Sequence, residues 1–206
     1  MVKDRGMTLA EMLTIIAIIG IIAALAYPSF RRTILRINLK KDLTIIYGDF
    51  ATARASAMEK GCDWDIMFLP DQNAYVIFSD NGIVSPGPDG EIFTEDDVIN
   101  TDYRNNGVLD NIYGEKATSK KVNLKFSRFG IPSDFNVTKL ACMNQPGNPP
   151  SNGVDFVNNI VRFSYLGVAR SGGAVYITNG KDLYAISVTG STGKITLCKW
   201  YGSIWK

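Results

Sequence analysis

A single run of apolar residues near the N-terminus limits what this chain can fold into. From Met12 to Tyr27 the sequence reads MLTIIAIIGIIAALAY, and Thr14 is its only polar side chain. The segment from Met7 to Tyr27 has 21 residues. As a helix it is about 30 Å long, close to the thickness of the hydrocarbon core of a bilayer. No second run of this kind occurs in the 206 residues. We therefore expect at most one membrane crossing, joined to a water-soluble domain.

Two ordinary explanations of this run are a cleaved secretory signal and a simple signal anchor. Lys3 and Arg5 precede the apolar stretch, and Ala24-Leu25-Ala26 looks like a signal peptidase site. Neither explanation accounts for Glu11. An ionised carboxylate inside an apolar helix costs about 3 kcal/mol on insertion scales, so its presence needs a reason.

The residues around Glu11 follow a specific pattern. Residues 3–11 read KDRGMTLAE. This segment resembles the class III leader of type IV prepilins and pseudopilins, in which a short charged leader ends in Gly and is followed by an apolar residue, T-L-x-E and an apolar run. Gly6 stands before the scission site, and Met7 stands where the family usually has Phe. Glu11 and Pro28 also occupy the positions that the family pattern gives to Glu and Pro.

The resemblance implies a processing step and an assembly step. A prepilin peptidase is expected to remove residues 1–6 after Gly6 and to methylate the amine of Met7. Glu11 would then pair with the methylated amine of a neighbouring subunit. A buried pair of this kind sets the register of a filament more than it adds stability. The implied partners are other pilins or pseudopilins, the prepilin peptidase, the inner-membrane assembly machinery and the lipid bilayer.

The charges that flank the apolar run conflict with the implied orientation. Two cations precede the run and five follow it, namely Arg31, Arg32, Arg36, Lys40 and Lys41. The positive-inside rule alone would place the N-terminus outside the cytoplasm. The resemblance implies the reverse, because the peptidase acts on a cytoplasmic leader. We therefore expect a single-pass protein of the bacterial inner membrane with residues 7–27 in the bilayer and the C-terminal domain outside the cytoplasm.

Helical periodicity continues beyond the apolar run, over residues 28–61. Apolar residues recur there at spacings of three and four, which predicts an amphipathic helix from Thr8 to Lys60. These residues are Leu35, Leu39, Leu43, Ile46, Phe50, Ala53 and Ala57. Pro28 is expected to kink the helix, and Gly61 is expected to end it.

After Gly61 the pattern changes to a period of two, which is typical of strands. Trp64–Leu69 and Ala74–Ser79 are predicted to form a hairpin. Further strands are predicted at residues 122–128, 159–166, 174–178, 183–189 and 195–201, with the last four forming an antiparallel meander. The predicted fold class is α+β: a long N-terminal membrane-inserting helix packed on a C-terminal antiparallel β-sheet domain, residues 62–206, as in pilins.

Two segments favour one branch of the family. Residues 53–61, ARASAMEKG, resemble a signature at the helix end of the GspH/FimT group. Parts of the C-terminal segment from residue 163 to residue 198 also resemble that group. The group comprises minor pseudopilins of type II secretion and minor pilin-like proteins of type IV pili, so the resemblance implies a minor subunit.

The middle of the chain, residues 80–121, lacks a clear period and is acidic. Eight carboxylates lie between Asp80 and Asp110. Clustered carboxylates with Gly turns suit Ca²⁺, which takes six to eight oxygen ligands. The segment also resembles the calcium loop of major pseudopilins. The candidate ligands are Asp89, Glu95, Asp96 and Asp97, and the alternative is a solvated acidic insertion.

Residue types exclude several classes of enzyme. The chain contains no histidine, so catalytic triads with histidine and imidazole metal sites are absent. Its three cysteines suit an oxidising exterior and allow three intramolecular pairings. Cys142 with Cys198 is favoured because both lie in the C-terminal half, and the alternative is that all three are small buried residues.

These observations predict a filament subunit of a type II secretion pseudopilus or a type IV pilus, without enzymatic activity, that contacts secreted substrate or other subunits. One alternative is a DNA-binding minor pilin for DNA uptake, with phosphates held by cations of the C-terminal sheet. Those cations are Arg162, Arg170, Lys181, Lys194, Lys199 and Lys206. Another alternative is a secreted binding protein cut after Ala26.

Overall fold

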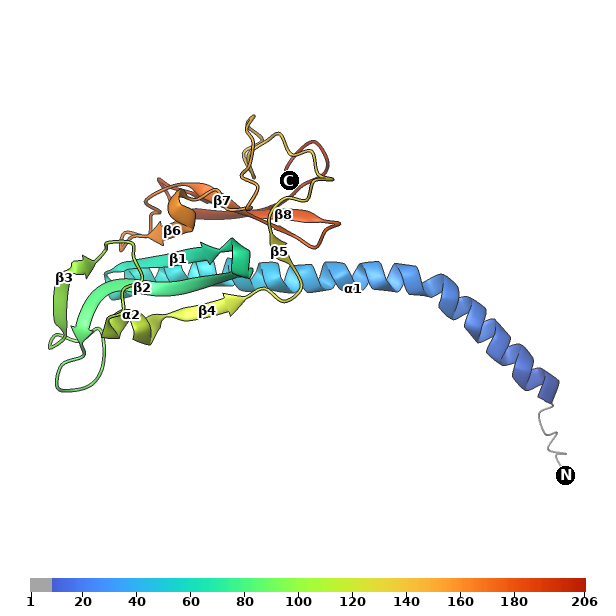
Figure 1. The fold of residues 1–206 in the computed structure, drawn as a ribbon, viewed down its shortest axis with the longest axis horizontal. Coiled ribbons are helices and arrows are strands. Elements are labelled where there is room, and N and C mark those ends of the chain that lie inside the picture. The colour runs from blue at the N-terminus through green and yellow to red at the C-terminus, as the bar shows by residue number, and fades with distance from the viewer. Residues whose placement is uncertain (1–8) are drawn as a thin grey trace, which may run out of the picture.

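One long helix and two antiparallel sheets make up the fold (Figure 1). The computed structural model describes residues 9–206, apart from the side chains of residues 26, 28 and 29. Helix α1 (Leu9–Lys60) has 52 residues, and its first half projects from the domain. Thr8, the predicted first residue of the helix, lies outside the described residues. At the other end, Gly61 has a φ of 67° and donates its N–H to the carbonyl oxygen of Ala57. The helix therefore ends where the sequence predicts, because glycine adopts this left-handed conformation without strain.

The first sheet lies against the C-terminal half of α1. Its strand order is β3-β2-β1-β6, and β4 pairs with the first part of β2. The bounds are β1 (Asp63–Leu69), β2 (Ala74–Ser85), β3 (Val98–Arg104), β4 (Lys120–Asn123) and β6 (Ile160–Phe163). The 3₁₀ turn η1 (Pro70–Gln72) joins β1 to β2, so the predicted hairpin is confirmed.

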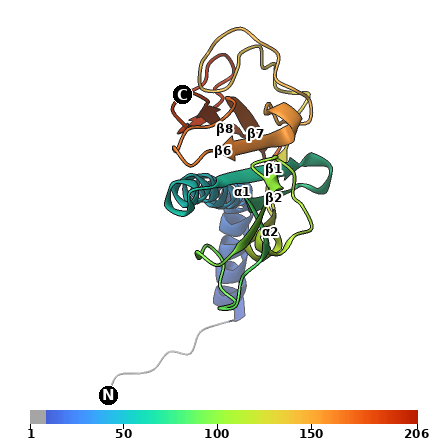
Figure 2. The ribbon, with the colours of Figure 1, turned by 90° about the vertical axis from the view of Figure 1, so that its left-hand side faces the viewer.

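The second sheet contains the C-terminal meander. Its order is β5-β7-β8-β9, with all pairs antiparallel. The bounds are β5 (Arg128–Phe129), β7 (Gly173–Thr178), β8 (Leu183–Thr189) and β9 (Lys194–Lys199). Two short helical segments complete the described elements, α2 (Tyr113–Thr118) and η2 (Val157–Asn159). Figure 2, which looks along the helix, shows β7 and β8 above α1 and α2 below it.

Both sheets share a core with α1. Phe50 is fully buried, and its ring lies 6.0 Å from that of Phe68 in β1 and 6.3 Å from that of Phe163 in β6. The same core includes Val175 of β7 and Ile186 of β8. Six residues of the predicted apolar stripe are buried and Leu35 is half-buried. The predicted α+β class, with a long helix packed on an antiparallel sheet domain, is confirmed.

Three details of the sequence prediction are wrong. The run 122–128 is not one strand, because β4 belongs to the first sheet and β5 to the second. The predicted first strand of the meander, β6, pairs with β1 instead of β7. The segment 80–121 is not a long irregular insertion, since it contains the end of β2, all of β3 and α2, and the start of β4. Periodicity does not reveal these elements because β3 is mostly exposed and α2 is only six residues long.

Candidate functional site

The first half of α1 is apolar apart from Glu11 and Thr14, and no other element of the described chain covers it. Every side chain from Leu9 to Leu25 is exposed, with Leu9 at 81% and Leu25 at 75%. Beyond this segment, by contrast, Leu39, Leu43 and later stripe residues are buried under the sheets. A helix that is apolar all round needs an apolar environment, either lipid or other helices.

Helix α1 is bent between its two halves. The segments Leu9–Leu25 and Phe30–Lys60 are inclined at 45° to each other, and the break between them includes Pro28. Proline is a common cause of such bends because it removes one backbone hydrogen bond and clashes with the preceding turn. Within the described residues, no single helix is long and apolar enough to cross a membrane. By length and composition, the two bent segments taken together are.

Glu11 lies in the first described turn of α1 and is exposed. It lines a shallow hollow of about 420 Å³ together with Ala10, Thr14 and Ile15. The Thr14 hydroxyl donates to the carbonyl oxygen of Ala10 at 2.8 Å. The carboxylate is therefore displayed on the outer side of an apolar helix. The predicted cleavage residues, Gly6 and Met7, lie outside the described residues, so their roles stay predictions.

The candidate calcium ligands mainly hold the backbone of their own loop. Asp97 Oδ2 accepts the N–H groups of Phe93 at 2.7 Å and Thr94 at 3.0 Å. Asp96 Oδ1 accepts the hydroxyl of Thr94 at 2.8 Å, and Asp89 Oδ1 accepts an N–H two residues later at 2.9 Å. In residues 9–206, no group of three or more Asp, Glu, Cys or His side chains is placed to hold a metal ion. Calcium binding by Asp89, Glu95, Asp96 and Asp97 stays a prediction.

The structure contains the favoured disulfide, Cys142–Cys198, with its Cα atoms 5.6 Å apart. It ties the loop after β5 to β9, beside a second core that holds Tyr176, Trp200 and Trp205. Cys62 is free and buried, and burial raises the pKa of its thiol to about 12. A thiol in this state is mostly protonated at neutral pH and is a poor nucleophile.

A cluster of buried acids lies at the end of the domain farthest from the apolar half of α1. Asp63, Asp65, Asp80 and Glu115 have no exposed surface. Arg162 Nε lies 3.0 Å and 3.1 Å from the two carboxylate oxygens of Asp65. Glu115 Oε2 accepts the backbone N–H of Asp110 at 2.5 Å. Burial raises the pKa of Asp65 to about 7 and that of Glu115 to about 8.

This cluster of buried acids is not among the sites predicted from the sequence. Asp63 and Asp65 alternate in β1, which is the spacing of side chains on one face of a strand. The antiparallel register places Asp80 opposite Asp63. Alternating acids in an otherwise apolar strand are a usable signal, but the register that unites them with Glu115 depends on the tertiary fold.

Half of the cations assigned to the DNA-binding alternative are already paired inside the domain. Arg170 Nη2 lies 2.7 Å from Asp63, Arg162 binds Asp65, and Lys199 Nζ lies 2.8 Å from Asp182. Lys181, Lys194 and Lys206, the remaining cations of that set, are exposed.

Comparison with known proteins gives one match, at the N-terminus. Residues 1–27 match the family model described as the prokaryotic N-terminal methylation motif. No curated protein and no solved structure matched the chain. The match covers the leader and the apolar run, and it supports a type IV pilin-like leader of class III that a prepilin peptidase processes. It also supports association with other pilins through the N-terminal helix.

Proposed function

We propose that this chain is a non-enzymatic subunit of a type II secretion pseudopilus or a type IV pilus. A prepilin peptidase would cut it after Gly6 and methylate Met7. Residues 7–27 would hold the chain in the bacterial inner membrane, with the domain outside the cytoplasm, until the helix joins those of other subunits in the filament. Glu11 would pair there with the amine of a neighbouring Met7.

The contrast between the two halves of α1 carries this proposal. The second half contributes to the core of a folded domain, whereas the first half presents apolar side chains to its surroundings, with Glu11 and Thr14 as the polar exceptions. A filament whose core is a bundle of such helices would cover this surface completely. The methylation motif over residues 1–27 supports the same function independently of the fold.

Blocking the leader cleavage tests the proposal. We expect the Gly6→Val variant to remain an uncleaved membrane precursor that is missing from filaments, because a side chain at Gly6 obstructs the scissile bond. Gly48→Val is the matched control, since a Cβ at exposed Gly48 meets nothing within 4 Å and this residue lies outside the proposed assembly segment. Intact mass and N-terminal sequencing report the outcome. A mature chain that begins at Tyr27, or normal cleavage of the Gly6→Val variant, would contradict the proposed processing.

The finer role is that of a GspH/FimT-like minor subunit that contacts secreted substrate or neighbouring subunits. Its support is the resemblance of residues 53–61 and of parts of the C-terminal sheet to that group. Deleting the gene for this chain in its host distinguishes a type II secretion pseudopilus from a type IV pilus. Loss of protein secretion with intact pili indicates a pseudopilus, and loss of pilus-dependent motility or DNA uptake indicates a pilus.

A further inference from the structure

The cations that follow the apolar run are not used by the proposed function. Five of them lie between residues 28 and 41, and no acid occurs in that stretch. The domain is expected outside the cytoplasm, where the positive-inside rule disfavours such a concentration of positive charge. A local partner of opposite charge would remove this conflict.

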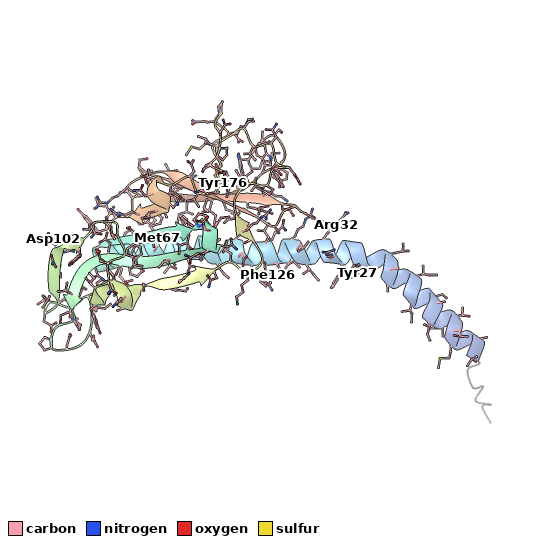
Figure 3. The ribbon with its side chains drawn as sticks, in the orientation of Figure 1. Tyr27, Arg32, Met67, Asp102, Phe126 and Tyr176 are labelled. Atoms are coloured by element: carbon pink, nitrogen blue, oxygen red, sulfur yellow. A yellow bond between two sulfur atoms is a disulfide. The ribbon has the colours of Figure 1, made fainter. Side chains whose placement is uncertain are left out.

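The structure places two of these cations in a hollow at the base of the domain. The hollow has a volume of about 270 Å³ and lies where the β7–β8 turn meets α1. Its lining residues are Arg32, Leu35, Arg36, Asn179, Lys181 and Asp182. Figure 3 shows Arg32 at this end of the domain, between Tyr27 and the second sheet.

Hydrogen bonds shape the hollow without engaging the charged side chains of Arg32 and Lys181. The Asn179 amide donates to the carbonyl oxygen of Leu35 at 3.2 Å, which fastens the turn to the helix. Asn179 Oδ1 accepts the backbone N–H groups of Lys181 at 2.9 Å and Asp182 at 2.8 Å. The shape of the turn is therefore fixed before any ligand arrives.

The charges in the hollow leave an excess of cations. Asp182 is its only acidic lining residue, and it contacts both Arg36 at 3.3 Å and Lys199 at 2.8 Å. Burial alone would raise the pKa of Asp182, but Lys199 and Arg36 hold it below its ordinary value. None of the ion pairs formed among residues 9–206 includes Arg32 or Lys181, and both are exposed.

The position of the hollow along the helix corresponds to lipid headgroups. Arg32 lies five residues after Tyr27, which is about 8 Å along a helix. The headgroup layer on each side of a bilayer extends about 5–8 Å beyond the hydrocarbon core. Arginine offers a planar set of donors that matches a phosphate, and lysine adds a second positive charge.

We propose that this hollow binds the phosphate of an anionic phospholipid headgroup on the face of the membrane that carries the domain, with Arg32 and Lys181 as its main ligands. The inference rests on the proposed membrane anchorage. The bound lipid would hold the base of the domain against the membrane before assembly, and the cations after residue 27 would then be neutralised locally.

Lipid retention by the full chain tests this inference. The purified chain in detergent is titrated with phosphatidylglycerol or with phosphatidylcholine, and native mass spectrometry counts the lipids that stay bound. We expect one phosphatidylglycerol to be retained in preference to phosphatidylcholine. Each of Arg32→Gln and Lys181→Gln should weaken this retention about fivefold, and the double variant should lose the preference. Lys116→Gln, an exposed lysine on α2, is the matched control and should behave as the parent chain.

Three outcomes would overturn the inference: equal retention of the two lipids, an effect of Lys116→Gln as large as that of Lys181→Gln, or displacement of the lipid by millimolar glycerophosphate, which would indicate a site for soluble phosphate. Both substituted side chains are exposed, so unchanged melting of the variants checks their folding. Cleavage after Gly6 and membrane insertion are measured separately on the same variants. A processed, inserted chain without lipid preference contradicts only the lipid site, whereas an unprocessed chain contradicts the proposed function.

Discussion

Glu11 is an ionisable side chain displayed on a helix segment that is otherwise apolar and exposed. In lipid, such a carboxylate costs about 3 kcal/mol on insertion scales, and the bilayer alone returns none of this. A cationic partner in a helix bundle offsets the cost. The proposed partner is the methylated amine of Met7 in a neighbouring subunit, so Glu11 matters only when the subunit assembles.

We therefore expect Glu11→Gln to be processed and to remain in the membrane, but to enter filaments at least about tenfold less than the parent chain. Immunoblots of sheared filaments against the membrane fraction measure this ratio. Glu59→Gln is the matched control, because Glu59 is an exposed acid at the opposite end of α1. Equal incorporation of Glu11→Gln would show that the carboxylate only contacts headgroups.

The buried acids make the stability of the domain depend on pH. Burial raises the pKa of Asp65 from 3.8 to about 7 and that of Glu115 from 4.5 to about 8. At pH values between the ordinary and the raised pKa of each acid, the folded state binds more protons than the unfolded state. The free energy of unfolding therefore falls as the pH rises through this window.

We expect the domain to melt at a higher temperature near about pH 5 than near about pH 8.5. Glu115→Gln should flatten this dependence, since it removes one of the buried carboxyls whose pKa is raised. Glu59→Gln, on the exposed helix surface, should leave the slope unchanged. A parent domain that melts at a higher temperature at the alkaline pH would show that these acids are ionised without cost. Thermal denaturation of the full chain in detergent, followed by circular dichroism, provides the measurement.

At the scale of elements, the loop between β2 and β3, residues 86–97, carries five carboxylates and no cation. Its carboxylates cap their own backbone, as Asp97 does for Phe93 and Thr94. The same oxygens repel one another, and a divalent cation that binds only the ordered loop would raise stability by mass action.

We expect the domain to melt several degrees higher in millimolar calcium than in chelator, and Asp96→Ala to abolish the difference. Magnesium should have a smaller effect, because it requires tighter octahedral geometry and retains its waters. Asp71→Ala, an exposed acid in η1, is the control and should keep the response. Identical melting in calcium and chelator would indicate that the acidic segment between β2 and β3 is a solvated loop without a metal site.

The elements that the sequence predicts best are those fixed by local signals. Helix α1 follows from an unbroken apolar stripe and a terminal glycine, and the hairpin β1–β2 follows from period two around Pro70. The division of residues 122–128 has a tertiary cause. Buried Asp42 of α1 accepts the N–H of Phe126 at 2.9 Å and the hydroxyl of Ser127 at 2.7 Å, which holds the chain as it crosses between sheets.

The candidate site residues also divide into those with a local sequence signal and those brought together only by the tertiary fold. Gly6, Met7 and Glu11 are predictable because a peptidase and a neighbouring helix recognise a short linear motif. The hollow around Arg32 and Lys181 was not predictable, since it joins residues about 150 positions apart through a turn whose place depends on the whole core.

For the whole molecule, α1 is the element that both sheets share. Phe50 is buried against rings of the first sheet, and the same core includes Val175 and Ile186 of the second sheet. Neither sheet can lose the helix without exposing the core of the other. The domain should therefore unfold in one cooperative transition.

We expect Phe50→Ala to lower the free energy of unfolding by about 3–5 kcal/mol while leaving a single transition. Tyr47→Ala, on a more exposed position of the same helix, should cost much less. Urea titrations followed by both circular dichroism and tryptophan fluorescence measure the two quantities. Separate midpoints for the two probes would show that the sheets unfold independently.

The bend in α1 sets the angle between the apolar first segment and the domain. From Leu35 onward α1 packs against the domain, and the Asn179–Leu35 and Arg36–Asp182 contacts tie the base of the second sheet to it. The direction of the first segment relative to the domain is therefore set between residues 25 and 30. The segment Phe30–Lys60 is about 46 Å long. A change of about 10° in the bend angle would therefore displace its far end by about 8 Å. A small difference in how the first segment packs in the proposed filament would therefore change the distance of the domain from the filament axis.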